Sequence, residues 1–227
     1  MGRVQFAGRS LSAVSFLVLL ACVSAILPVT LKAACHVEYS LMESSCLAGH
    51  FLIAMPAMAD PNFKGTVTYL CEHNERGALG VVVNRPTDLT MESLFEQIEI
   101  DVSDLALSQR KVHFGGPVSV EHGFVLHRSH GSWNSSIVVS DELSLTTSKD
   151  ILEAVAHGNG PSEWLLTLGY AGWGAGQLEE EIAANAWLTV PADAEMLFEI
   201  PPEGLLDAAI ERLGISKFAL SNVAGHA

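Results

Sequence analysis

Apolar and polar positions alternate in short runs from about residue 50 onward, and turn-forming residues bound each run. Runs of this length that are rich in aliphatic and β-branched side chains are typical of β-strands. The pattern predicts seven strands, at residues 51–55, 66–71, 78–84, 111–114, 123–127, 136–140 and 164–168. The segments between them, such as 74–77 and 158–161, contain glycine, asparagine or proline, which suit tight turns.

A spacing of three and four residues marks the helices. Met91, Leu94, Phe95 and Ile98 repeat at helical intervals behind Thr90, a residue suited to capping the first turn. The same criterion predicts helices after Ser148, with Gly158 as the stop, over 177–187 and over 205–213. Because strands and helices are clustered rather than strictly alternating, we expect an α+β fold: a single compact domain with a mixed or antiparallel sheet flanked by about four helices.

The first 41 residues carry a different pattern, in which two arginines precede a nearly uncharged stretch over 11–31. The sequence LLAC ending at Cys22 loosely resembles the cleavage box of a bacterial lipoprotein signal. The stretch is also long enough to span a bilayer as a helix. We favour a third interpretation, in which Met42 is the true start and residues 1–41 are upstream sequence. The folded domain would then be residues 42–227.

Composition and charge narrow the class of protein. Hydrophobic residues make up 49% of the chain and charged residues 17%, which is enough apolar sequence for a substantial core. The formal charge is −14, and the 9 basic and 25 acidic residues from position 42 onward give that part −16. Such a charge repels phosphate backbones, and Arg110-Lys111 is the only adjacent basic pair. Direct nucleic-acid binding is therefore disfavoured.

Four groups of motifs stand in a recognisable order. They read GHFLIAMP at 49–56 with DPNF at 60–63, EHN at 72–74 with GALGVVVNRP at 77–86, GGPV at 115–118 with GFVLH at 123–127, and LGYAGWGAGQLE at 168–179 with NAW at 185–187, and the chain ends in GHA at 225–227. By these motifs the chain from about Cys46 to Ala227 resembles the AlgH/YqgE family of bacterial proteins. The resemblance implies a compact cytoplasmic domain, often labelled a transcriptional regulator, and it carries over no catalytic residue. The extension before Met42 departs from the family pattern.

Glycines are concentrated between Gly169 and Gly176, after a predicted strand and before a predicted helix. Glycine lets backbone amides approach a ligand closely, but this spacing matches neither a dinucleotide fingerprint nor a Walker loop. Three glutamates at 179–181 would also repel a phosphate from the start of the helix. We therefore expect no cofactor here, and favour a tight turn that packs Tyr170 and Trp173 beside the sheet.

A second candidate is the corner where Asn84 and Arg85 end an apolar strand and Pro86 holds Arg85 in an extended backbone. This arginine either clamps a carboxylate ligand or neutralises Glu181 or another internal carboxylate, and the sequence leaves both interpretations open. Asn185 follows an apolar helical stripe that Glu181 borders. We favour a satisfied buried network there over a polar pocket in which Glu181 acts as acid or base.

The histidines at positions 113, 122, 127 and 130 lie close together in the sequence. They form no HxH pair and no HExxH helix, so we predict no metal site. His127, at the end of a predicted strand, remains a pocket candidate. No GxSxG elbow occurs, and Cys71 in its apolar strand has no activating neighbour beyond Glu72 and His73.

The leading hypothesis is a non-enzymatic, cytoplasmic binding or regulatory domain that acts through a small-molecule ligand or a protein partner. The alternative is an enzyme of unknown reaction with a pocket around Arg85, Tyr170, Trp173 and Glu181. The ligand-pocket candidates are Asn84, Arg85, Gly115, Gly116, His127, Tyr170, Trp173, Glu181 and Asn185. A membrane or lipoprotein location is expected only if residues 1–41 are genuinely present.

Overall fold

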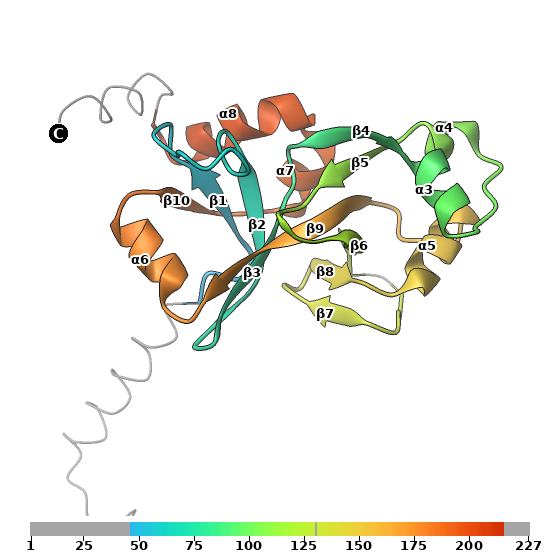
Figure 1. Ribbon diagram of the computed structural model, residues 1–227, viewed down its shortest axis with the longest axis horizontal. Helices are drawn as coiled ribbons and strands as arrows, with labels where there is room; N and C mark the ends of the chain where they lie inside the picture. Colours follow the sequence, from blue (N-terminus) through green and yellow to red (C-terminus); the bar gives the residue numbers. More distant parts are fainter. Residues whose placement is uncertain (1–45, 130, 216–227) are drawn as a thin grey trace, which may run out of the picture. The chain divides into compact units, whose positions relative to one another are not determined.

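The computed structural model describes residues 46–129 and 131–215. The interpretations of residues 1–41, of His130 and of the terminal GHA lie outside the described residues. Within the described part, the chain is an α+β domain dominated by its sheet (Figure 1).

Ten strands and six helices make up the described part of the chain. The strands are β1 (His50–Ala54), β2 (Val67–Asn74), β3 (Gly77–Val82), β4 (Pro86–Thr90), β5 (Lys111–Phe114), β6 (Val118–Arg128), β7 (Ser136–Val138), β8 (Leu143–Thr146), β9 (Trp164–Gly174) and β10 (Trp187–Pro191). The helices are α3 (Met91–Gln97), α4 (Leu105–Ser108), α5 (Lys149–Ala156), α6 (Gln177–Ala183), α7 (Ala194–Glu199) and α8 (Pro202–Arg212). The expectation of about four helices is therefore corrected to six in this part of the chain.

The two additional helices are too short to show a helical repeat in the sequence. α4 has four residues and α7 has six. Each is started by an aspartate whose side chain accepts hydrogen bonds from the first turn, Asp104 for α4 and Asp193 for α7. These local capping signals, rather than an apolar stripe, mark where both helices begin.

The sheet is mixed, with antiparallel pairs predominating. Its strand order is β10-β1-β2-β3-β9-β6-β8-β7, and β5 pairs with β4 and β9 beside this path. β5 runs parallel to β9, whereas β3 and β6 run antiparallel to it. β9 therefore contacts three strands and links the parts of the sheet.

Most of the glycine-rich segment predicted as a tight turn belongs to β9, which continues to Gly174, and only Ala175 and Gly176 form a turn before α6. Gly116 and Gly169 allow two backbones to pass closely. A Cβ built on Gly116, which has φ +155°, would lie 2.1 Å from the carbonyl carbon of Tyr170. A Cβ on Gly169, which has φ +72°, would lie 2.4 Å from the Gly116 carbonyl oxygen. No larger residue fits either position without moving the backbone.

The helix predicted over 177–187 ends earlier, at Ala183. Asn185 adopts a left-handed conformation with φ 58°, and the amides of Asn185 and Ala186 donate to the carbonyls of Ile182 and Glu181. This Schellman arrangement closes α6. It frees the chain to enter β10, which pairs with β1.

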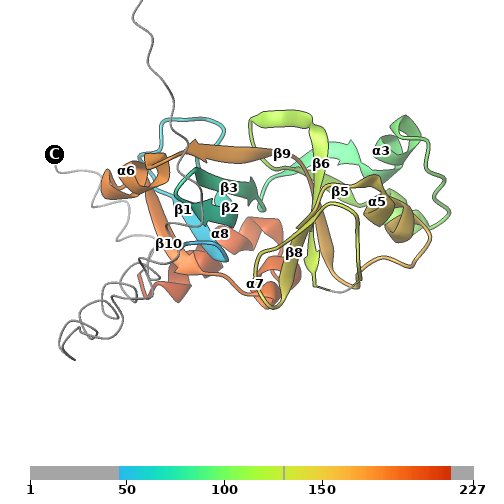
Figure 2. The ribbon, with the colours of Figure 1, turned by 90° about the horizontal axis from the view of Figure 1, so that it is seen from below.

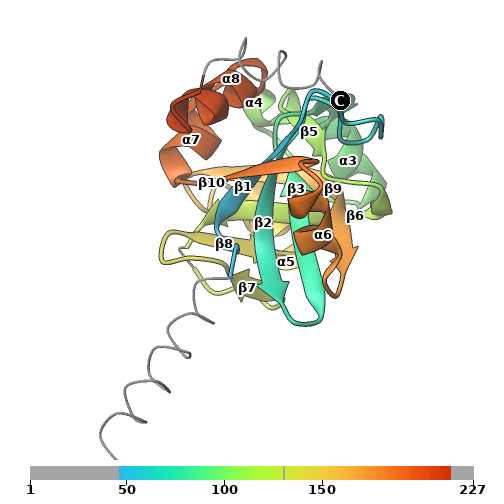
Figure 3. The ribbon, with the colours of Figure 1, turned by 90° about the vertical axis from the view of Figure 1, so that its left-hand side faces the viewer.

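Three apolar clusters form the core. One contains Leu197 of α7 and Leu205 of α8, a second joins Phe95 of α3 to Ile151 of α5, and a third includes Leu178 of α6. Figures 1 and 2 show α3 and α5 at one end of the sheet and α6 at the other. Figure 3 shows α7 beside α8, and α8 contacts β1 and β2. None of the helices in residues 46–129 and 131–215 combines the length and apolar character required to cross a membrane.

Candidate functional site

The side chain of Arg85 holds a loop of its own chain. Its guanidinium donates to the backbone carbonyls of Pro61 at 3.2 Å, Asn62 at 2.8 Å and Lys64 at 3.1 Å. Its Cζ also lies 5.6 Å from the centre of the Phe114 ring. These contacts fix the loop between β1 and β2 against the end of β3, and they account for most of the donors of this arginine.

Asn84 stabilises the same loop. Its Oδ1 accepts from the amide of Val67 at 2.8 Å, and its Nδ2 donates to the carbonyl of Gly65 at 3.1 Å. The neighbouring Gly115 joins this corner to β9, since its carbonyl accepts from Val82 and its amide donates to Leu168, both at 2.8 Å. The Asn-Arg corner, Gly115 and β9 therefore lie together in the fold.

The aromatic side chains predicted for this pocket separate onto different faces of β9. Tyr170 packs against Phe124, with ring centres 5.4 Å apart, whereas Trp173 packs against Trp187 at 5.9 Å. Because side chains alternate between the two faces of a strand, residues three apart point to opposite faces. Both residues nevertheless line one pocket of about 290 Å³ together with residues of β2 and β3, and Arg85 and Glu181 are not among its lining residues.

Glu181 is bound by two indole rings rather than by Arg85. Its Oε2 accepts from Trp173 Nε1 at 2.9 Å and from Trp187 Nε1 at 2.8 Å, and its Oε1 accepts from Gln177 Nε2 at 2.9 Å. The suggested pairing of Glu181 with Arg85 is thus replaced by a carboxylate that satisfies two buried tryptophans. Asn185 is exposed at the end of α6 and belongs to no buried network.

His127 has partners on both ring nitrogens. It is 1% exposed, its Nδ1 donates to the Arg128 carbonyl at 2.7 Å, and its Nε2 lies 2.9 Å from Thr146 Oγ1. Burial lowers the pKa of His127, and the Arg128 carbonyl opposes that shift. These contacts describe a neutral ring that joins β6 to β8.

His113 in β5 is different. It is 7% exposed, and neither ring nitrogen has a hydrogen-bond partner among residues 46–129 and 131–215. Burial, followed by the positive charge of Arg110, lowers the pKa of His113 to about 4, while the backbone of Lys111 and the carboxylate of Glu203 oppose the shift. The ring is therefore neutral near pH 7, and neither nitrogen has a hydrogen bond of normal geometry in the described ranges.

The ring of His113 lines a cavity of about 320 Å³ between the sheet and the turn that joins α7 to α8. Most of the residues that line it are apolar. The lining residues are Val83, Arg110, His113, Trp164, Leu165, Leu197, Phe198, Glu199, Ile200, Pro201, Pro202 and Leu205. We call this space the His113 cavity. It combines two convergent polar groups with an apolar surround, as small-molecule sites usually do.

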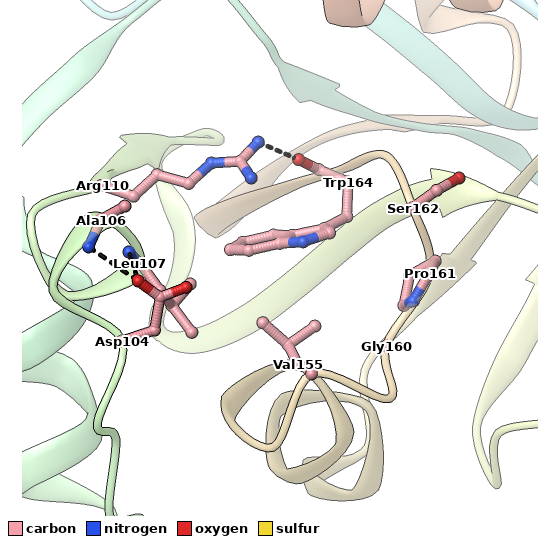
Figure 4. A pocket seen from close by; sticks show the side chains of 10 residues that line it. Asp104, Ala106, Leu107, Arg110, Val155, Gly160, Pro161, Ser162 and Trp164 are labelled. Atoms are coloured by element: carbon pink, nitrogen blue, oxygen red, sulfur yellow. Dashed lines mark hydrogen bonds between the residues drawn. The ribbon is translucent and has the colours of Figure 1, made fainter.

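Arg110 lies at the edge of this cavity, immediately before β5. Its Cζ is 3.9 Å from the centre of the Trp164 ring, and its Nη2 donates to the Trp164 carbonyl. Figure 4 shows the guanidinium over the indole, with Val155 and Leu107 on the far side of a second cavity of about 390 Å³. Burial lowers the pKa of Arg110, but a guanidinium remains charged in proteins.

The pairing of Arg110 with His113 was not predicted from the sequence, where His113 was considered only as a metal ligand. A usable signal was present in the sequence: His113 lies within the short predicted strand 111–114, and this strand directly follows Arg110. No group of three or more metal-ligating side chains occurs within the described ranges. Arg110 and His113 offer the site hydrogen-bonding groups and one positive charge.

The fold and this cavity define a sheet-dominated α+β domain with a partly polar cavity between its sheet and the helices α7 and α8. Comparison with known proteins then assigns the family. The profile described as "DUF179: AlgH-like" matches residues 51–217, and the chain belongs to this AlgH-like family.

Relatives and solved structures agree with this assignment. A UPF0301 protein of Ralstonia nicotianae is 58% identical over 181 residues, which cover 80% of this chain and 95% of that protein. A UPF0301 protein of Thiobacillus denitrificans is 55% identical over 186 residues, covering 82% of this chain and all of that protein. The solution structure of AlgH from Pseudomonas aeruginosa has 50% identity and a TM-score of 0.68, covering 81% of this chain and 97% of that one. A crystal structure of a Corynebacterium diphtheriae protein, at 21% identity and TM-score 0.57 over 73% of this chain and 86% of that one, shares the fold.

Proposed function

We propose that this protein is a regulatory binding domain that responds to a small-molecule ligand held in the His113 cavity. The observation that carries the proposal is the buried imidazole of His113, which is 7% exposed and has no hydrogen-bond partner in the described part of the chain. A buried polar group without a partner destabilises a folded protein by about 1–3 kcal/mol. A bound ligand that satisfies the ring would offset that penalty.

A binding role agrees better with the contacts than an enzymatic one. Glu181, the acid or base of the enzymatic alternative, already accepts hydrogen bonds from Trp173, Trp187 and Gln177. Arg85 is likewise engaged by loop carbonyls. A catalytic group must reach a reacting atom, and these two side chains are directed at the protein itself.

The transcriptional label of the AlgH/YqgE family would then describe an indirect effect. With a formal charge of −14, the chain is expected to repel a DNA backbone unless a local basic patch intervenes. We propose that regulation, in the cytoplasm, passes through the ligand or through a protein partner instead.

The test is a thermal-shift screen of metabolites on the wild-type protein and on His113→Phe, beside a DNA mobility-shift assay at several salt concentrations. We expect at least one metabolite to raise the melting temperature of the wild type and not of the variant, with no DNA shift. Salt-sensitive DNA binding without any metabolite effect would overturn the proposal. So would stabilisation that is unchanged in His113→Phe.

A further inference from the structure

The ligand class can be inferred from the two polar residues, Arg110 and His113, that line the His113 cavity. Arg110 and His113 are separated by two residues in the sequence, and both line the same space together with Trp164. A guanidinium has five N–H donors, and the one hydrogen bond that the Arg110 guanidinium makes within the described part of the chain goes to the Trp164 carbonyl. Donors therefore remain on Arg110 for a second acceptor.

His113 contributes one more donor. Its neutral ring carries one N–H, and neither ring nitrogen makes a hydrogen bond of normal geometry within the described ranges, although the Lys111 backbone lies close to the ring. A ligand oxygen between the two residues would receive one N–H from the ring and one or two from the guanidinium. Charge-assisted bonds of this kind are roughly twice as strong as bonds between neutral groups.

The charge of the lining selects an anion over a cation. Arg110 is the arginine that lines the cavity. The acid in the lining, Glu199, is exposed to solvent, as is Glu203, whose charge also acts on His113. A cationic ligand would be placed against a guanidinium that is already partly desolvated by Trp164. A multiply charged phosphate would in turn lose more hydration than one arginine can replace.

The remaining wall selects an apolar body. On one side, the wall of the cavity is formed by α7 and the residues that follow it. These are Leu197, Phe198, Ile200, Pro201 and Pro202. These side chains offer no charge and favour aliphatic or aromatic groups. The cavity volume of about 320 Å³ lies at the lower end of the usual range for small-molecule sites, which indicates a compact ligand.

We propose that the His113 cavity binds a small organic monocarboxylate, with the carboxylate between Arg110 and His113 and the apolar part against Trp164 and Phe198. This inference rests on the proposed function, because it names the chemical class of the regulatory ligand. It assigns the charge recognition to Arg110 and the neutral hydrogen bond to His113.

The experiment compares matched probes on the full chain by isothermal titration calorimetry. Benzoate, phenylacetate and hexanoate are the carboxylates, benzamide and hexanamide are neutral isosteres, and benzylamine is the cation. We expect the carboxylates to bind at least 10-fold more tightly than the amides, and benzylamine to bind least. Each tenfold difference corresponds to about 1.4 kcal/mol.

Variants assign the contacts. Arg110→Gln is expected to weaken the carboxylates by at least tenfold and to leave the amides nearly unchanged, whereas His113→Phe weakens both classes. Arg76→Gln is the matched control for lost charge, because Arg76 is exposed on the turn between β2 and β3, and it should bind the carboxylates as the wild type does. If Arg110→Gln does not fold by circular dichroism, Arg110→Lys keeps the charge without the planar fork and should bind with intermediate affinity.

The outcomes separate this inference from the proposed function. Equal or tighter binding of amides or of benzylamine, lost in His113→Phe, would overturn the carboxylate assignment while leaving a ligand in the cavity. Carboxylate binding that is unaffected by Arg110→Gln would also overturn it. If no probe binds the wild type, the carboxylate inference fails, and the metabolite screen alone then decides the proposed function.

Discussion

The guanidinium of Arg110 covers the indole ring of Trp164, with 3.9 Å between its Cζ and the ring centre, and the carbonyl of the same tryptophan accepts a hydrogen bond from it. Trp164 is only 6% exposed as a result of this and its other packing. Both residues line the His113 cavity and the neighbouring cavity of about 390 Å³. The pair thus lies between two pockets, and the strength of its contact can be measured.

Arg110→Gln should lower the free energy of unfolding by about 1–2 kcal/mol, because it removes a cation–π contact and a charge-assisted hydrogen bond. Urea denaturation followed by circular dichroism measures the change. The control is Arg76→Gln at an exposed turn, which we expect to change stability by less than about 0.5 kcal/mol. Equal effects of the two substitutions would show that the stack over Trp164 contributes nothing specific.

His113→Phe should stabilise the ligand-free protein by about 1–3 kcal/mol, because it replaces a buried ring without hydrogen-bond partners by an apolar ring of similar shape. The same substitution at His127 should have the opposite sign, since His127 bonds the Arg128 carbonyl and Thr146. Chemical denaturation of both variants gives the comparison. A loss of stability in His113→Phe as large as in His127→Phe would mean that His113 is satisfied in solution.

As the pH is lowered, the free energy of unfolding of the wild type should decrease more steeply than that of His113→Phe. The pKa of His113 is lowered from 6.5 to about 4 in the folded protein, so between these values only the unfolded chain binds the proton. The contribution of the neutral ring is complete above about pH 6.5 and is lost as the pH falls toward 4, on the order of 3 kcal/mol in total. Unfolding free energies of both proteins at several pH values measure the difference. His127 contributes equally in both proteins, so its contribution cancels. A difference between the two proteins that is independent of pH would contradict the assignment.

Glu181→Ala should destabilise the protein by about 2–4 kcal/mol, because the N–H groups of Trp173 and Trp187 lose their common acceptor. Trp173 is 7% exposed and Trp187 is 2% exposed, so water cannot easily replace the carboxylate. Denaturation monitored by tryptophan fluorescence reports both the stability and the environment of the indoles. Glu180→Ala, at an exposed position on the same helix, is the control and should be nearly neutral. A neutral Glu181→Ala would return Glu181 to consideration as a functional carboxylate.

Gly116→Ala should prevent folding or cost more than about 4 kcal/mol, because its Cβ would lie 2.1 Å from the backbone of Tyr170. Gly176→Ala provides the comparison: Gly176 has φ +76°, but a Cβ there meets nothing within 4 Å. Only the backbone strain of about 1–2 kcal/mol is then expected. Soluble yield and thermal melting distinguish the two variants. Similar behaviour of both would show that β6 and β9 can separate at this point.

Local features of the sequence were sufficient wherever one element carries its own signal. The predicted strand 111–114 coincides with β5, and the helix predicted behind Ser148 is α5. Gly158 ends that helix as expected, with φ +74° and its amide bonded to the Val155 carbonyl. These elements depend on side-chain periodicity and on caps within a few residues, which a single sequence displays directly.

Elements that depend on pairing partners were missed. β4 begins at a proline and is largely polar, and it forms a strand because β5 supplies its hydrogen bonds. β10 contains Trp187, which the helical pattern had placed in α6, and it pairs with β1 from more than a hundred residues away. Propensity decides such segments less strongly than the neighbouring strand does.

The same division applies to the site. The sequence by itself determined the α+β class, the family motifs and the acidic balance. Only the tertiary structure decided that Arg85 and Glu181 bond to separate parts of the protein, and that His113 lies buried beside Arg110 without a hydrogen-bond partner in the described chain. The physical reason is that periodicity reports which face of an element is buried, whereas hydrogen-bond satisfaction depends on atoms brought together from β5, β9 and α7.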